Sequence, residues 1–178
     1  AYLAQLAKMR MNFIGLHCYP EGRYGPEPLV WIGQPSDLDP DGRATFTYPA
    51  QWAHTGRDMW GYAGMKTSDF SAGSASVFET DDFGPDVQDF EGVADVTGAV
   101  TAEARRLGVK TCIGTETPLA VPDAVRARLG NTGKAPDTAR RLYAAMFRRI
   151  AATHPLDYYW FWTPEGWTWE GTNEAQVK

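Results

Sequence analysis

Two glutamates follow apolar segments of the chain, and each has a proline within two residues. Glu116 follows residues 109–115, and Glu165 follows residues 156–162. Both segments have the composition of buried parallel strands, and β/α folds build their sites at the C-terminal ends of such strands. Carboxylates on neighbouring strands, which lie about 4.8 Å apart, can fall within the roughly 5–9.5 Å separation that glycosidases use. We therefore predict Glu116 as a general acid/base and Glu165 as the nucleophile or second carboxylate.

Tryptophan residues surround the second acid in the sequence. They are Trp160, Trp162, Trp167 and Trp169. Flat indole rings stack on the apolar faces of pyranoses, so carboxylates among tryptophans suit a site that cleaves sugars. We predict that Trp162 and Trp167 line a sugar subsite.

Four further residues are candidates for substrate binding: His17, Tyr19, Trp31 and Asp82. His17, near the end of an apolar segment, is either a core histidine or a hydrogen-bond partner of a sugar hydroxyl. Trp31 either pins a loop or stacks on a sugar. Asp82, beside Asp81, either caps the helix that we expect from Pro85 or orients substrate and tunes Glu116.

Helical and extended patterns alternate along the chain. We expect strands at 12–19, 109–115 and 156–162, and helices at 1–9, 85–108, 122–129 and 136–153. Strands that alternate with helices predict an α/β fold with a parallel sheet. Three strands cannot close a (β/α)8 barrel of about 250 residues. We therefore predict that residues 1–178 are a single domain and part of a larger TIM-type barrel polypeptide, which supplies the other strands. A small open sheet is the alternative.

Residues 21–83 form a long segment rich in glycine, proline and aromatic residues, without clear periodicity. We interpret it as a loop insertion after the first strand, with short hairpins near 29–32 and 44–48. Loops of this length inside a compact domain are usually functional. We expect it to cover the site and to bring Trp31, Trp52 or Trp60 near the two acids. A peripheral subdomain or an oligomer contact is the alternative.

The composition excludes several classes of function. The net charge of −5 argues against a nucleic-acid partner, and no apolar run is long enough for a membrane span. The chain lacks a signal-peptide pattern and does not begin with methionine, so we expect its natural start further upstream. Only three histidines occur, none at ligand spacing, so we predict neither a metal nor another cofactor.

Two smaller features have ordinary structural interpretations. Cys18 and Cys112 fall on predicted strands, where we expect buried free thiols rather than a disulfide. Four arginines are expected on the solvated outer face of the helix at 136–153: Arg140, Arg141, Arg148 and Arg149.

Most of the chain resembles a known group of enzymes. The segment from Lys8 to His17, KMRMNFIGLH, resembles the start of the first barrel strand in β-N-acetylhexosaminidase and α-glucuronidase-like glycoside hydrolases. Residues 25–33 and 158–169 also look like bacterial members of this group. The resemblance implies a (β/α)8 barrel, carboxylate catalysis and a periplasmic or secreted role in polysaccharide degradation. Thr115 stands where the hexosaminidases have the aspartate of their Asp-Glu pair, which argues against substrate-assisted chemistry on an N-acetyl sugar.

The leading hypothesis is therefore a glycoside hydrolase that acts on an oligosaccharide or polysaccharide. A carbohydrate-binding protein without catalytic activity would use the same aromatic residues, but it would not require the acids. A barrel lyase or isomerase that acts on sugar acids, with Tyr19 or His17 as base, is the third hypothesis.

Overall fold

The structure, a computed structural model, describes residues 2–18, 29–48, 50–51, 82–83, 87–117, 121–130, 137–163, 171 and 173–177. Its elements, in chain order, are α1 (Tyr2–Lys8), β1 (Phe13–Cys18), η1 (Pro35–Asp37), β2 (Ala50–Gln51), β3 (Asp82–Phe83), α3 (Val87–Arg106), β4 (Lys110–Glu116), α4 (Asp123–Leu129), α5 (Thr138–Thr153), β5 (Tyr158–Trp162) and α7 (Glu174–Val177). Most predicted helices and strands are found within a few residues of the expected positions.

A parallel sheet of three strands in the order β1-β4-β5 is the centre of the described fold. Strand β4 lies between the others, with Gly15 opposite Cys112 and Glu116 opposite Trp162. The predicted α/β class and the parallel pairing are therefore confirmed. Strands β2 and β3 form a separate antiparallel pair of two residues each.

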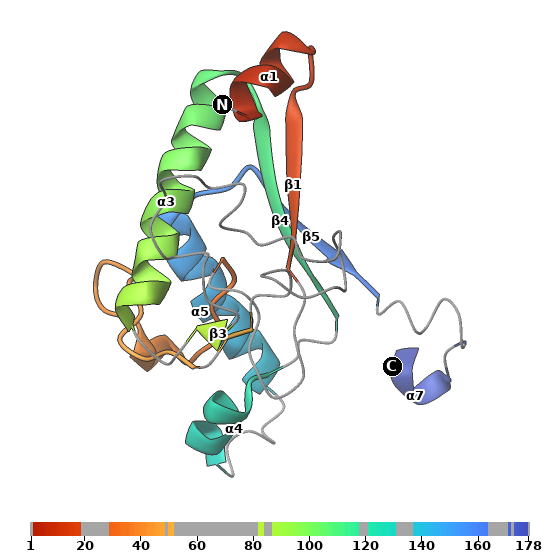
Figure 1. Cartoon of the computed structure of the whole chain (residues 1–178). Coiled ribbons are helices and arrows are strands. Elements are labelled where there is room, and N and C mark those ends of the chain that lie inside the picture. Colours follow the sequence, from red (N-terminus) through yellow and green to blue (C-terminus); the bar gives the residue numbers. More distant parts are fainter. Residues whose placement is uncertain are drawn as a thin grey trace.

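The helices α3 and α5 lie along one side of this sheet (Figure 1). In α5, the buried residues Leu142, Met146 and Ile150 recur every four positions, and the last two pack against Ile113 of β4. Tyr159 and Phe161 of β5 face the same helix and contact Phe147 edge-on. This packing fixes which side of each strand is buried beneath helices.

The buried stripe of α3 runs through Phe90, Val93, Thr97, Thr101 and Ala104. Val100 has helical spacing from Val93 and Ala104, yet its side chain is exposed because the stripe passes through Thr97 and Thr101. Helix α3 ends at Arg106, and Gly108, two residues later, has a φ of 72°. The amides of Gly108 and Val109 bond back to the carbonyls of Arg105 and Ala104, so the chain turns directly into β4.

The described part of the long insertion, residues 29–48, packs against the helices. Its buried side chains join a cluster with residues of α3, α4 and α5: Trp31, Ile32, Leu38, Ala44 and Tyr48. In place of the two expected hairpins, one reversal pairs Leu38 with Ala44. That the insertion covers the site stays a prediction; the apolar residues of this part are buried in the core, against helices and, for Leu29 and Val30, also against Cys18 and Ile113 of the sheet. Trp52 and Trp60 lie outside the described residues.

Strand β5 was expected to be buried, yet Tyr158, Trp160 and Phe161 are 55%, 51% and 45% exposed. The strand forms an edge of the described sheet, so its aromatic side chains have strand neighbours on one side. The two cysteines are buried free thiols, as expected. Cys18 lies opposite Thr115 and Cys112 opposite Gly15, which places the thiols on opposite faces of the sheet.

Candidate functional site

The sheet has one face that the long helices leave uncovered. Side chains alternate between the two faces of a strand, and residues paired in register share a face. We call this face of the sheet the aromatic face. On this basis it carries Phe13, Lys110, Cys112, Gly114, Glu116, Tyr158, Trp160 and Trp162. It lies opposite the side on which Tyr159 and Phe161 contact α5.

Glu116 is the last residue of the central strand and stands at the C-terminal end of the aromatic face. Its register partner is Trp162, the last residue of β5. Beyond this pair the strands stay connected, because the Thr117 amide donates to the Trp162 carbonyl at 2.8 Å and the Thr117 hydroxyl donates to the same oxygen at 3.3 Å. Glu116, which is half-buried, and Trp162 are therefore neighbours in register at this end of the sheet.

The indole rings of Trp160 and Trp162 form a pair on this face, with centroids 4.9 Å apart and planes inclined by 53°. Gly114, two residues before Glu116, provides the space that they occupy. A β-carbon at Gly114 would collide with the carbonyl oxygen of Trp160 and would lie 2.9 Å from Cζ3 of Trp162. The Trp162 ring thus extends across the central strand, next to the position of Glu116.

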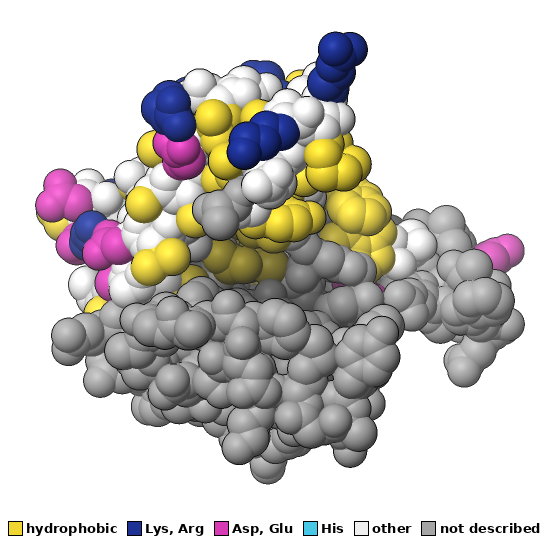
Figure 2. All heavy atoms as spheres, turned by 45° about the horizontal axis from the view of Figure 1, so that its top comes forward, with side chains coloured by type: hydrophobic (Ala, Val, Ile, Leu, Met, Phe, Trp, Pro, Cys, Tyr) yellow, Lys and Arg dark blue, Asp and Glu magenta, His cyan; other side chains and the backbone are white. Residues whose placement is uncertain are grey.

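An open hollow of about 690 Å³ continues the aromatic face toward the N-terminal ends of the strands. Phe13, Cys112, Tyr158 and Trp160 line it, together with Lys110. The Lys110 ammonium lies 2.6 Å from Oδ1 of Asp157, and this hydrogen bond raises the pKa of Lys110 and lowers the pKa of Asp157. Figure 2 shows hydrophobic side chains gathered on one side of the described part of the molecule.

Several predicted site residues cannot be placed in this geometry. Glu165, Tyr19 and Trp167 lie outside the described residues. His17 is placed by its backbone opposite Gly114, and Asp82 by its backbone opposite Gln51 in the small β2–β3 pair. Of the predicted residues, the structure brings together Glu116 and Trp162.

Trp31, predicted to line the sugar subsite, is a core residue instead. Its side chain is 0% exposed, and its Nε1–H donates to the carbonyl of Phe46 at 2.9 Å. The indole fills space between the insertion and the helices, so it offers no face to a ligand. The prediction for Trp31 is therefore wrong, and the alternative that it pins a loop is supported.

The helix side of the sheet holds a buried ionic group that the sequence did not reveal. Arg149, expected on a solvated helix face, is 0% exposed. Its Nη2 lies 3.1 Å from Oε1 of Glu91 and also donates to the Phe90 carbonyl. Burial lowers the pKa of Arg149, while the charge of Glu91 opposes this effect. Glu91 in turn accepts from Arg43 and from the Ala44 amide, which attaches the insertion to α3.

His154 and Tyr48 complete this attachment. Because a carbonyl can only accept, His154 Nε2 donates its proton to the Leu29 oxygen at 3.0 Å, and Nδ1 pairs with the Thr153 hydroxyl. Burial lowers the pKa of His154 to about 4, and the nearby charge of Arg149 adds to this shift. Tyr48 donates to the Val30 carbonyl and accepts from the Ile32 amide, and burial raises its pKa. The hydrogen bonds of these groups hold residues 29–48 in place.

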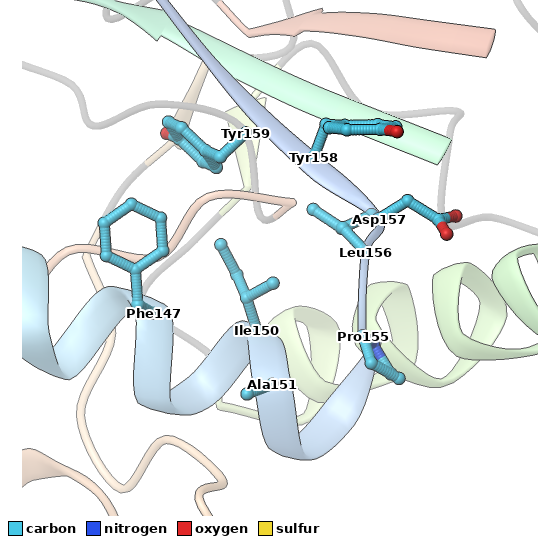
Figure 3. Close-up of a pocket in the computed structure, with 8 residues that line it drawn as sticks. All are labelled: Phe147, Ile150, Ala151, Pro155, Leu156, Asp157, Tyr158 and Tyr159. Carbon is cyan, nitrogen blue, oxygen red and sulfur yellow. The ribbon is translucent and has the colours of Figure 1, made fainter. Parts of the chain in front are cut away.

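A second hollow, of about 310 Å³, lies between α5 and the start of β5. Figure 3 shows Phe147 and Ile150 rising from the helix toward the strand, with Tyr158 and Tyr159 pointing to opposite sides of β5. The lining is apolar except for Asp157 and the tyrosine hydroxyls. This hollow offers packing space rather than catalytic groups.

No cluster of three or more histidine, cysteine, aspartate or glutamate residues that could hold a metal ion occurs in the described part of the chain. Among the helices that the structure describes, none has both the length and the apolar character needed to cross a membrane.

Comparison with protein-family models, with curated proteins and with solved structures found no match for this chain.

Sequence reasoning missed Gly114 as part of the site. A glycine within a strand often marks a close approach by another group, and this was the available signal. This signal alone could not identify the approaching group, because that group depends on the register between β4 and β5. Trp160 and Trp162 are neighbours because residues two positions apart on a strand share a face.

Proposed function

We propose that the protein is a glycoside hydrolase in which Glu116 acts as general acid/base and Glu165 as the nucleophile or second carboxylate. The observation that carries the proposal is the position of Glu116, at the C-terminal end of the central strand and beside the Trp160–Trp162 pair. Glycoside hydrolysis uses a pair of carboxylates, and aromatic rings beside them can stack on the sugar.

The proposal includes a fold in which the described sheet is part of a (β/α) barrel. The strands follow one another across the sheet in chain order, and α3 and α5, which connect them, lie on the same side. In a doubly wound sheet the order reverses and helices cover both faces, whereas a barrel has its helices on one face. The resemblance of residues 8–17 to barrel glycosidases agrees with this assignment. The extracytoplasmic location that the resemblance implies belongs to the same proposal.

The test measures hydrolysis of a panel of oligosaccharides by the Glu116→Gln and Glu165→Gln variants. The release of reducing ends reports the activity. Loss of a general acid/base or a nucleophile should lower kcat by about 10²-fold or more, while glutamine keeps the shape of the side chain. Glu103→Gln, on the exposed surface of α3, is the matched control and should retain activity. Near-normal turnover in both variants would refute the assignment.

A carbohydrate-binding protein is the second candidate, because the aromatic pair is present in the described structure independently of Glu165. Binding without any release of reducing ends, at high protein concentration and over many hours, would favour this candidate. Mass analysis of the products separates hydrolysis, which adds water, from elimination, which does not.

A further inference from the structure

The N-terminal end of the sheet is described without a gap at every point where the chain enters a strand. The segments that lead into β1, β4 and β5 are residues 8–13, 102–110 and 154–158. Parallel strands begin at the same edge of a sheet, so these segments lie at one end of the molecule, with α1 beside the first two (Figure 1). This end is opposite to the end at which Glu116 stands.

Helix α1 is fixed to this end of the sheet by its apolar side. Leu6 forms a buried cluster with Ala104, near the end of α3, and with Val109, just before β4. The helix closes with a turn in which the amides of Arg10 and Met11 donate to helix carbonyls at 3.0 and 2.9 Å. The residues that follow α1 are therefore held next to the last turn of α3.

Positive charge is concentrated at this end, although the chain as a whole carries a net charge of −5. The three segments contain five cations and two acids, which are Lys8, Arg10, Arg105, Arg106 and Lys110, and Glu103 and Asp157. Glu103 binds Arg106, and Asp157 binds Lys110. Asp157 raises the pKa of Lys110, and Arg105 is near enough for its charge to oppose this rise.

The other three cations, Lys8, Arg10 and Arg105, are exposed and have no acidic partner among the described residues. The acids of these segments are already bound, so the three positive charges are available to an anionic partner. Charge of this kind at one end of an acidic protein creates a local attraction that the net charge conceals.

Apolar side chains stand exposed among these cations. Residues 8–13, with the sequence KMRMNF, are all exposed. Met9, Met11 and Phe13 are 64%, 48% and 51% exposed. Figure 2, turned to bring this end forward, shows Lys and Arg side chains beside hydrophobic ones. Scattered apolar side chains are ordinary on a protein surface, whereas a group of them among unpaired cations indicates an interaction surface.

Arg10 occupies a backbone conformation that favours glycine. Its φ is 60°, in the left-handed region, at the position after a helix where glycine is most common. Glycine would suit this turn better than arginine does. The choice of arginine therefore has to be explained by what its exposed side chain does outside the turn.

We propose that this end of the molecule is a docking surface for an anionic lipid bilayer. Lys8, Arg10 and Arg105 bind headgroup phosphates, and Met9 and Met11 enter the boundary between the headgroups and the acyl chains. An acidic peptide would neutralise the cations but would give the methionines no apolar medium, so the bilayer fits both features. The proposal is independent of the proposed hydrolysis, and it directs Glu116 away from the membrane.

The experiment is co-sedimentation of the protein with large unilamellar vesicles, either of phosphatidylcholine alone or with about 30% phosphatidylglycerol. We expect binding to the anionic vesicles to be at least about tenfold tighter in low salt, and to weaken in 0.5 M salt because the ionic attraction is screened. Equal binding to both vesicles, or no binding to the anionic ones in low salt, would overturn the proposal.

Arg10→Gly tests the charge without disturbing the turn, because glycine is the residue that this turn favours. The variant should bind anionic vesicles about three- to fivefold more weakly, with an unchanged or higher melting temperature. Arg140→Gln is the matched control, because it removes an exposed cation near the start of α5. It should bind as the wild type does. An equal loss in both variants would mean that net charge, and not this surface, attracts the vesicles, and would refute the proposal.

The methionines separate a bilayer from an acidic chain. The double variant Met9→Ser and Met11→Ser should bind anionic vesicles about threefold more weakly or less, with the same response to salt as the wild type. Val96→Ser, at an exposed apolar residue of α3, is the control and should not alter binding. If poly-glutamate binds as tightly as the anionic vesicles and the double variant binds both as the wild type does, the partner is an acidic chain and the bilayer is excluded.

Discussion

The two sides of the β1-β4-β5 sheet use charged residues differently. On the helix side, Arg149 and Glu91 are withdrawn from solvent and bonded to each other and to backbone groups. On the aromatic face, Lys110 and Glu116 stand at opposite ends of a strand, with apolar rings between and beside them. Charge on the helix side is used to hold the insertion in place, whereas charge on the aromatic face is accessible to ligands. Stability and recognition should therefore respond to different substitutions.

Arg149→Met should produce the largest loss of stability. It leaves Glu91 partly buried without its closest cation, and breaking a buried pair in this way typically costs about 3–5 kcal/mol. Urea denaturation measures the loss, which we expect near the lower limit because Arg43 still bonds to Glu91. Arg148→Met, one position earlier and exposed, should change stability little. Equal effects of the two variants would contradict the contrast between buried and exposed charges.

His154 should give the helix side its own dependence on pH. Its pKa is lowered from 6.5 to about 4 in the folded protein, so the unfolded chain takes up the proton first as pH falls. The free energy of unfolding is therefore highest above pH 6.5 and should fall by about 3 kcal/mol between pH 6.5 and pH 4 from this group.

The measurement for His154 is urea denaturation at several pH values, for wild type and His154→Gln. Glutamine cannot take up the proton, so the variant should be less stable at pH 7 and should approach the wild type near pH 4. Parallel curves for the two proteins would mean that His154 does not titrate as its burial requires.

Gly114→Ala tests whether the aromatic face needs the close approach of β5. The added methyl group meets backbone and ring atoms of Trp160 and Trp162, and such overpacking typically costs about 1–3 kcal/mol. Gly92→Ala is the control, because its β-carbon would meet nothing within 4 Å in the middle of α3. That substitution should leave stability unchanged or raise it slightly. If Gly114→Ala leaves the free energy of unfolding unchanged, the two strands can move apart without loss of stability.

Lys110→Met should have the smallest effect. The ion pair with Asp157 is largely exposed, and such pairs contribute little to stability. We expect the melting temperature to change by less than about 2 °C, with the difference abolished in 0.5 M salt. A larger change that persists in salt would assign Lys110 a structural role comparable to that of Arg149.

The regular elements could be predicted because their signals are local. The spacing of Leu142, Met146 and Ile150 predicts a buried helix face, and Gly108 predicts where the preceding helix stops. The alternation of helices and strands was enough to predict the parallel sheet. The prediction that Glu116 ends a strand also needs only local information, and the structure confirms it.

The remaining errors come from contacts between residues distant in the sequence. Arg149 is buried because Glu91, more than fifty residues earlier, provides its partner. Trp31 is buried because the insertion packs against three helices, which no pattern within residues 21–83 could indicate. The exposure of Trp160 follows from the edge position of β5, although its composition is typical of a central strand.

The place of β4 in the sheet has a consequence for motion. Of the three strands, β4 alone has described strand partners on both sides, and its amides should therefore exchange with solvent most slowly. Strand β5, which carries the tryptophan pair, has a strand partner on one side among the described residues and should open more often. Glu116 would then remain in place while the rings of β5 rearrange.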